Sequence, residues 1–91
     1  MFQVAFTRLE DFAAEVRRVG APGAKVVVEE DGQVVAWAVD QRYLRASQVF
    51  LVCRPPREAG DAAQVGARLE ELGVRICQGR AQHPPRRLVS G

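Results

Sequence analysis

The sequence predicts a single small α/β (α+β) domain, in which a mixed sheet of four to five strands carries two helices. The 91 residues suffice for one hydrophobic core but not for two. Apolar residues recur at helical spacing in two segments, and valine-rich runs of strand length lie between these segments. The predicted order is therefore (β)αβββαβ, with residues 1–79 as the globular domain and residues 80–91 as a basic, proline-containing C-terminal tail.

The first predicted elements are a short edge strand over residues 2–6 and a helix directly after it. Thr7 and Glu10 have the spacing of a capping box, in which each side chain accepts from the other residue's backbone N–H. Gly20, in a left-handed conformation, and then Pro22 are expected to end this helix. Its apolar stripe is Leu9, Phe12, Ala13, Val16 and Val19.

A β-hairpin is predicted where Asp31-Gly32 separates two valine-rich runs, residues 24–30 and 33–39. A type I′ turn would need a positive φ at both Asp31 and Gly32. The return strand is apolar on both of its faces. We therefore expect it to lie in the centre of the sheet.

The second half of the chain predicts a strand, a helix and a last strand. Residues 48–53 form a buried strand, which Pro55 and Pro56 end. Asp61 is the expected N-cap of the helix and Gly73 its C-terminal cap. Residues 74–78 would then run parallel to residues 48–53 after a right-handed crossover. The side chains expected to point inward from the helix are Ala62, Val65, Leu69 and Leu72.

Composition indicates a cytoplasmic protein. No apolar run approaches the roughly 20 residues of a membrane span, and no secretory signal precedes the domain. Cys53 and Cys77 are interpreted as small apolar residues in neighbouring strands, without a disulfide. Arginine outnumbers lysine twelve to one, which fits a GC-rich genome and a thermophilic source.

Charge is distributed unevenly along the chain, which favours a polyanionic partner. The net charge of +2 divides into −3 for residues 1–41 and +5 for residues 42–91. A one-sided basic surface attracts phosphates, and a tyrosine between two arginines can stack a base. The alternative is that codon usage supplies arginine and the groups scatter over the surface. The candidate DNA- or RNA-binding residues are Arg42, Tyr43, Arg45, Arg54, Arg57, Arg80, Arg86 and Arg87.

The order of elements from Val34 to Gln78 resembles the core of the PD-(D/E)xK nucleases. Asp40-Gln41-Arg42 falls where that family has its (D/E)-x-K motif, so the resemblance implies a site containing Asp40 and Arg42. Arg42 replaces the family's lysine, and a guanidinium is a poorer proton acceptor. The family's second metal-binding aspartate is replaced by Lys25 and Val26, and the nearest acids follow at the hairpin turn. The resemblance therefore implies a nuclease-like fold that is either active or degenerate.

No catalytic residue, metal site or cofactor is predicted. The sequence lacks a glycine-rich phosphate loop and other short catalytic motifs, and its single histidine, His83, lies in the tail. The acidic run of residues 29–31 is interpreted as a solvated turn, with Mg²⁺ binding as the alternative. We expect an interaction domain rather than an enzyme, either self-associating as a homodimer or part of a larger complex. The alternatives are the nucleic-acid-binding module and the nuclease-like fold.

Overall fold

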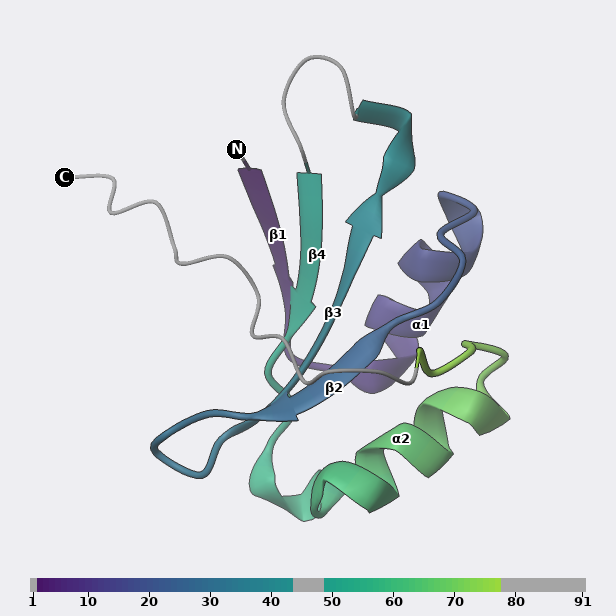
Figure 1. Cartoon of the computed structure of the whole chain (residues 1–91). Helices are drawn as coiled ribbons and strands as arrows, with labels where there is room; N and C mark the ends of the chain where they lie inside the picture. Colours follow the sequence, from purple (N-terminus) through teal and green to yellow (C-terminus); the bar gives the residue numbers. More distant parts are fainter. Residues whose placement is uncertain (1, 44–48, 78–91) are drawn as a thin grey trace, which may run out of the picture.

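A four-stranded mixed sheet with two helices on it confirms the predicted α+β class (Figure 1). The computed structural model describes residues 2–43 and 49–77, so the predicted tail lies outside the described residues. The strands are β1 (Phe2–Phe6), β2 (Lys25–Val28), β3 (Val34–Asp40) and β4 (Val49–Cys53). The helices are α1 (Leu9–Arg18) and α2 (Ala62–Glu71), with short 3₁₀ turns η1 (Gln41–Tyr43) and η2 (Arg57–Ala59).

The strands lie in the order β1-β4-β3-β2. β1 pairs parallel to β4, whereas β3 pairs antiparallel to both β4 and β2. β3 therefore occupies a central position, as its two apolar faces predict. β1 lies at one end of the sheet, which agrees with the predicted edge strand.

The predicted last strand is shorter than expected, because within the described residues it is a single parallel bridge between Ala24 and Ile76. The Ala24 N–H donates to the Arg75 carbonyl, and the Cys77 N–H donates to the Ala24 carbonyl, both at 2.8 Å. Ala24 directly precedes β2, so the segment around Ile76 pairs with the sheet only at the start of β2. Its direction is that of β2 and therefore of β4, as the crossover predicts.

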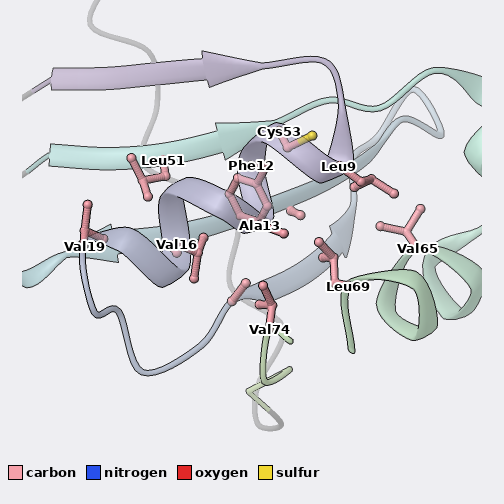
Figure 2. Close-up of a cluster of buried hydrophobic side chains, with 13 residues drawn as sticks. Leu9, Phe12, Ala13, Val16, Val19, Leu51, Cys53, Val65, Leu69 and Val74 are labelled. Atoms are coloured by element: carbon pink, nitrogen blue, oxygen red, sulfur yellow. The ribbon is translucent and has the colours of Figure 1, made fainter. Parts of the chain in front are cut away.

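Both helices cover the same face of the sheet and form the main core with it (Figures 1 and 2). Phe12 of α1 is fully buried between the helices and β4, and its ring meets that of Phe6 edge-to-face at 6.0 Å. Val65 and Leu69 of α2 are also fully buried, whereas Ala62 and Leu72 are half-buried. The whole predicted stripe of α1 lies in this core, namely Leu9, Phe12, Ala13, Val16 and Val19.

The opposite face of the sheet carries a second apolar cluster. The Trp37 and Phe50 rings lie 6.1 Å apart, and the Lys25 Nζ atom lies 5.7 Å from the centre of the Trp37 ring. No helix among the described residues packs on this face. The cluster explains why the sequences of β3 and β4 are continuous apolar runs. Its buried members are Val27, Val35, Trp37, Phe50 and Val52.

The predicted capping box at Thr7 is wrong, although the helix ends are otherwise as expected. The N-cap of α1 is Arg8, whose side chain makes no capping hydrogen bond. The first helical hydrogen bond runs from the Phe12 N–H to the Arg8 carbonyl at 3.1 Å, so the helix starts one residue later than a Thr7 cap requires. Asp61 does cap α2, through a reciprocal box with Gln64. Gly20 and Gly73 have the expected positive φ.

The predicted hairpin exists, but the prediction of a type I′ turn is wrong. Gly32 has a φ of 85°, whereas Asp31 does not have a positive φ. The Gly32 N–H donates to the Glu29 carbonyl at 2.9 Å, and the Glu29 N–H donates to the Gln33 carbonyl at 2.8 Å. This is a three-residue loop in which only the last residue is left-handed. Asp31 therefore avoids the left-handed conformation, which is costly for a residue other than glycine. Its carboxylate accepts from the Gln33 N–H at 2.9 Å.

Both cysteines are free thiols, and the interpretation that they lie in neighbouring strands is wrong. Cys53 belongs to β4, while Cys77 lies beside Ala24 at the start of β2, so β3 separates the two. Burial raises the pKa of the Cys53 thiol to about 12. That thiol is therefore protonated at neutral pH and is a core residue rather than a nucleophile.

Candidate functional site

The predicted residues Asp40 and Arg42 form a tight ion pair at the end of β3. Asp40 is 2% exposed, and the Arg42 side chain turns back from η1 to meet it. Arg42 Nε donates to Oδ1 at 3.0 Å and Arg42 Nη2 donates to Oδ2 at 2.8 Å. The Arg42 backbone N–H also donates to Oδ1 at 3.1 Å. These hydrogen bonds hold the pKa of Asp40 below its usual value, against the opposing effect of burial.

Helix α1 adds a second ion pair beside the first. Arg18 Nε donates to Glu15 Oε1 at 2.8 Å, and this contact lowers the pKa of Glu15. The charge of Arg18 also lowers the pKa of Asp40, and the charge of Arg42 lowers that of Glu15. Together the four side chains form a charged cluster, here defined as Glu15, Arg18, Asp40 and Arg42, whose charges sum to zero.

An apolar patch adjoins this cluster on the same face of the sheet. The register places Phe2 beside Val49 and Val49 beside Asp40, so the three side chains form a row across the sheet. Phe2 is 63% exposed, and Val4, two residues along β1, is 42% exposed. Phe6, the next residue on this face, packs against α1 instead. We call Phe2 and Val4 the β1 patch.

The described nucleic-acid candidates lie at opposite ends of the sheet. Arg42 follows β3, whereas Arg54 and Arg57 follow β4, which runs antiparallel to β3. The length of these strands separates the two groups by roughly 20 Å. Arg54 Nε lies 3.4 Å from Glu29 Oε1, and Arg57 is exposed on η2.

The structure places only one of the remaining candidates. Tyr43 lies in η1, and Arg45, Arg80, Arg86 and Arg87 fall outside the described residues. Nucleic-acid binding therefore stays a prediction.

The acids that the nuclease resemblance would bring together lie apart in the described chain. Glu29 and Glu30 occupy the hairpin before β3, whereas Asp40 ends that strand. Both carboxylate oxygens of Asp40 accept from Arg42. Among residues 2–43 and 49–77, no group of three or more His, Cys, Asp or Glu side chains is placed to hold a metal ion. The nuclease-like alternative stays a prediction without a metal-binding cluster in the described part.

We expect Asp40→Asn to lower the free energy of unfolding by about 1–2 kcal/mol at pH 7, since it removes charge-assisted hydrogen bonds from a buried site. Because folding lowers the pKa of Asp40, its carboxylate stabilises the fold above its unfolded pKa of about 3.9. That contribution is lost as the pH falls through the folded value. The difference between wild type and variant should therefore shrink below about pH 4.

Urea unfolding across a pH series measures this effect. Glu15→Gln is the matched control, because Glu15 also pairs with an arginine but in a more exposed position. It should cost less than about 1 kcal/mol. An equal loss for Asp40→Asn at pH 3 and at pH 7 would contradict the assignment.

The fold and this surface define the class of protein: a small α+β domain with an apolar edge patch beside a neutral charged cluster. No protein-family model, curated protein or solved structure matches the chain. No helix in the described part is long and apolar enough to cross a membrane.

Sequence reasoning did not single out Phe2, Val4, Glu15 or Arg18 as site residues. The apolar alternation of β1 is visible in the sequence. The sequence does not show how much of the sheet α1 leaves uncovered, because that depends on how the helix packs.

Proposed function

We propose that this chain is an interaction domain that self-associates through β1. The observation that carries the proposal is the β1 patch: two large apolar side chains, Phe2 and Val4, exposed next to each other on an edge strand. Single exposed apolar residues are ordinary, but adjacent ones rimmed by charged groups are typical of contact surfaces.

The composition of β1 supports this role. Phe2–Phe6 has the sequence FQVAF, with no charge and no proline. In proteins that remain monomeric, an edge strand usually carries a charge or a proline, which blocks pairing with another chain. The other end of the sheet differs, because β2 begins with Lys25 and the bridge to Ile76 adjoins its start.

A second copy of the chain is the partner that suits this surface. Val4 is the central residue of the five-residue strand, so a two-fold axis near Val4 would place two antiparallel β1 strands side by side. Phe2 of each copy would then lie near Phe6 of the other, which gives a continuous apolar strip. The charged cluster beside the patch is neutral overall, so two copies would not repel one another there.

We expect the full chain to form a dimer, with a mass of twice the 10.0 kDa of one chain, in sedimentation velocity over a concentration series. Val4→Glu should weaken the dimer at least about tenfold, because the contact would bury an unpaired carboxylate. The matched control is Val28→Glu, which changes an exposed valine on the opposite edge strand. It should leave the dimer unchanged.

Two results would refute the proposal. One is a chain that stays monomeric up to millimolar concentration. The other is a dimer that Val28→Glu weakens as much as Val4→Glu does. Circular dichroism of both variants distinguishes a lost contact from a lost fold.

A further inference from the structure

A cavity of about 760 Å³ opens where the parallel strands β1 and β4 end. Its walls come from the β1–α1 connection, from the segment after β4 and from α2. The volume lies in the range of pockets that hold small molecules. In open sheets with parallel strands, the crevice beyond the carboxyl ends of those strands is a frequent ligand site.

Three arginines from separate parts of the chain line the cavity: Arg8, Arg54 and Arg68. Arg8 Nη2 lies 3.7 Å from Glu10 Oε2, and Arg54 Nε lies 3.4 Å from Glu29 Oε1. Both separations are longer than a good charge-assisted hydrogen bond. The Arg8 pair is exposed and the Arg54 pair is half-buried, and loose pairs of this kind contribute little stability, so a ligand could replace them at small cost.

Arg68 differs from the other two. The structure gives it no ion pair or hydrogen bond through its side chain within the described residues. A guanidinium on the wall of a cavity offers a planar fork of donors, which fits phosphate and carboxylate groups.

The start of α1 adds backbone donors to these arginines. The first helical hydrogen bond runs from the Phe12 N–H to the Arg8 carbonyl at 3.1 Å. The N–H groups of Leu9, Glu10 and Asp11 precede it, and among the described residues no capping side chain bonds to them. Thr7, whose predicted capping role fails, lines the cavity beside them.

Part of the wall is apolar, with Leu9, Pro55, Pro56 and Ala59 next to the polar groups. An inorganic anion would leave this surface uncovered. A ligand with both a charged group and an apolar body would use both parts of the cavity.

We infer that this cavity binds a small organic phosphate ester, with the phosphate between Arg54, Arg68 and the start of α1 and the organic group against the prolines. The inference is independent of self-association, because it uses none of the residues of the β1 patch.

Two carboxylates limit the affinity. Glu10 and Glu58 also line the cavity, so part of the positive charge is already balanced. We therefore expect that removing the Glu10 charge tightens binding of the anion. The change removes the repulsion between Glu10 and the anion, and it releases Arg8 from its ion pair with Glu10.

The test is a titration of the ¹⁵N-labelled full chain with phenyl phosphate, followed by amide chemical shifts. We expect saturable shifts at Leu9, Glu10 and Asp11, with a dissociation constant near or below about 1 mM. Inorganic phosphate should bind several-fold more weakly, since it cannot contact the apolar wall. Arg68→Ala should weaken phenyl phosphate binding about tenfold, and Glu10→Gln should strengthen it.

Arg75→Ala is the control, because Arg75 is exposed and does not line the cavity. It should bind phenyl phosphate as the wild type does. Absent or non-saturable shifts would overturn the inference, as would equal losses for Arg68→Ala and Arg75→Ala. Weaker binding by a folded Glu10→Gln variant would overturn it as well. A monomeric chain that binds phenyl phosphate would refute self-association while leaving this inference intact.

Discussion

Replacing Phe12 by alanine should lower the free energy of unfolding by about 3–5 kcal/mol. Phe12 is fully buried and lies where α1 faces β4 and α2 (Figure 2). Its removal loses apolar burial and the edge-to-face contact with Phe6, and it leaves a cavity that the β-sheet cannot close.

Thermal and urea unfolding measure this loss. For a domain of this size, the melting temperature should fall by more than about 12 °C. Phe12→Leu should cost less, since it keeps most of the volume. Val28→Ala is the exposed comparison, with a side chain that is 51% exposed, and should change stability by less than about 0.5 kcal/mol. Similar losses for Phe12→Ala and Val28→Ala would contradict the assigned core.

Gly60→Ala should lower the free energy of unfolding by about 2–4 kcal/mol. Gly60 has a φ of 98° and a ψ of −164°, a conformation that is available almost only to glycine. An added Cβ would also overlap the Gln64 side-chain oxygen, which accepts from the Asp61 N–H at 2.9 Å. The substitution therefore strains the backbone and breaks the capping box of α2 together.

Gly32→Ala is the matched control for this effect. Gly32 also has a positive φ, but a Cβ added there meets no atom within 4 Å. It should cost about 1–2 kcal/mol, from backbone strain alone. If the two alanine variants lose equal stability in urea unfolding, the contact between residue 60 and Gln64 contributes nothing to the start of α2.

The two proposed surfaces are built from different residues. The β1 patch consists of Phe2 and Val4, at the beginning and the centre of the strand, and the cavity lies beyond Phe6, where the strand ends. No residue of the β1 patch lines the cavity, so each surface can be tested with substitutions that leave the residues of the other intact.

The sequence by itself determined the elements whose signals are local. Helix α1 is predicted by an apolar stripe with helical spacing, and all of its stripe residues are buried. The Asp61 cap, the Gly20 and Gly73 ends and the central position of β3 follow from side-chain chemistry within a few residues. The same local signals predict the hairpin but not the conformation of its turn, because the hydrogen bond from the Gln33 N–H to the Asp31 carboxylate favours a different loop.

Only the tertiary structure decided which distant residues meet. Helix α1 starts after Arg8 rather than after Thr7, and its N-cap side chain makes no capping bond beside the cavity. The antiparallel register of β3 and β4 placed Arg42 and Arg54 at opposite ends of the sheet, although they are near in sequence. Phe2 and Phe6 lie on the same face of β1, but α1 covers Phe6 and leaves Phe2 exposed. Such outcomes depend on which strands pair and on how the helices pack against them, and the residue pattern of a single segment does not specify its neighbours.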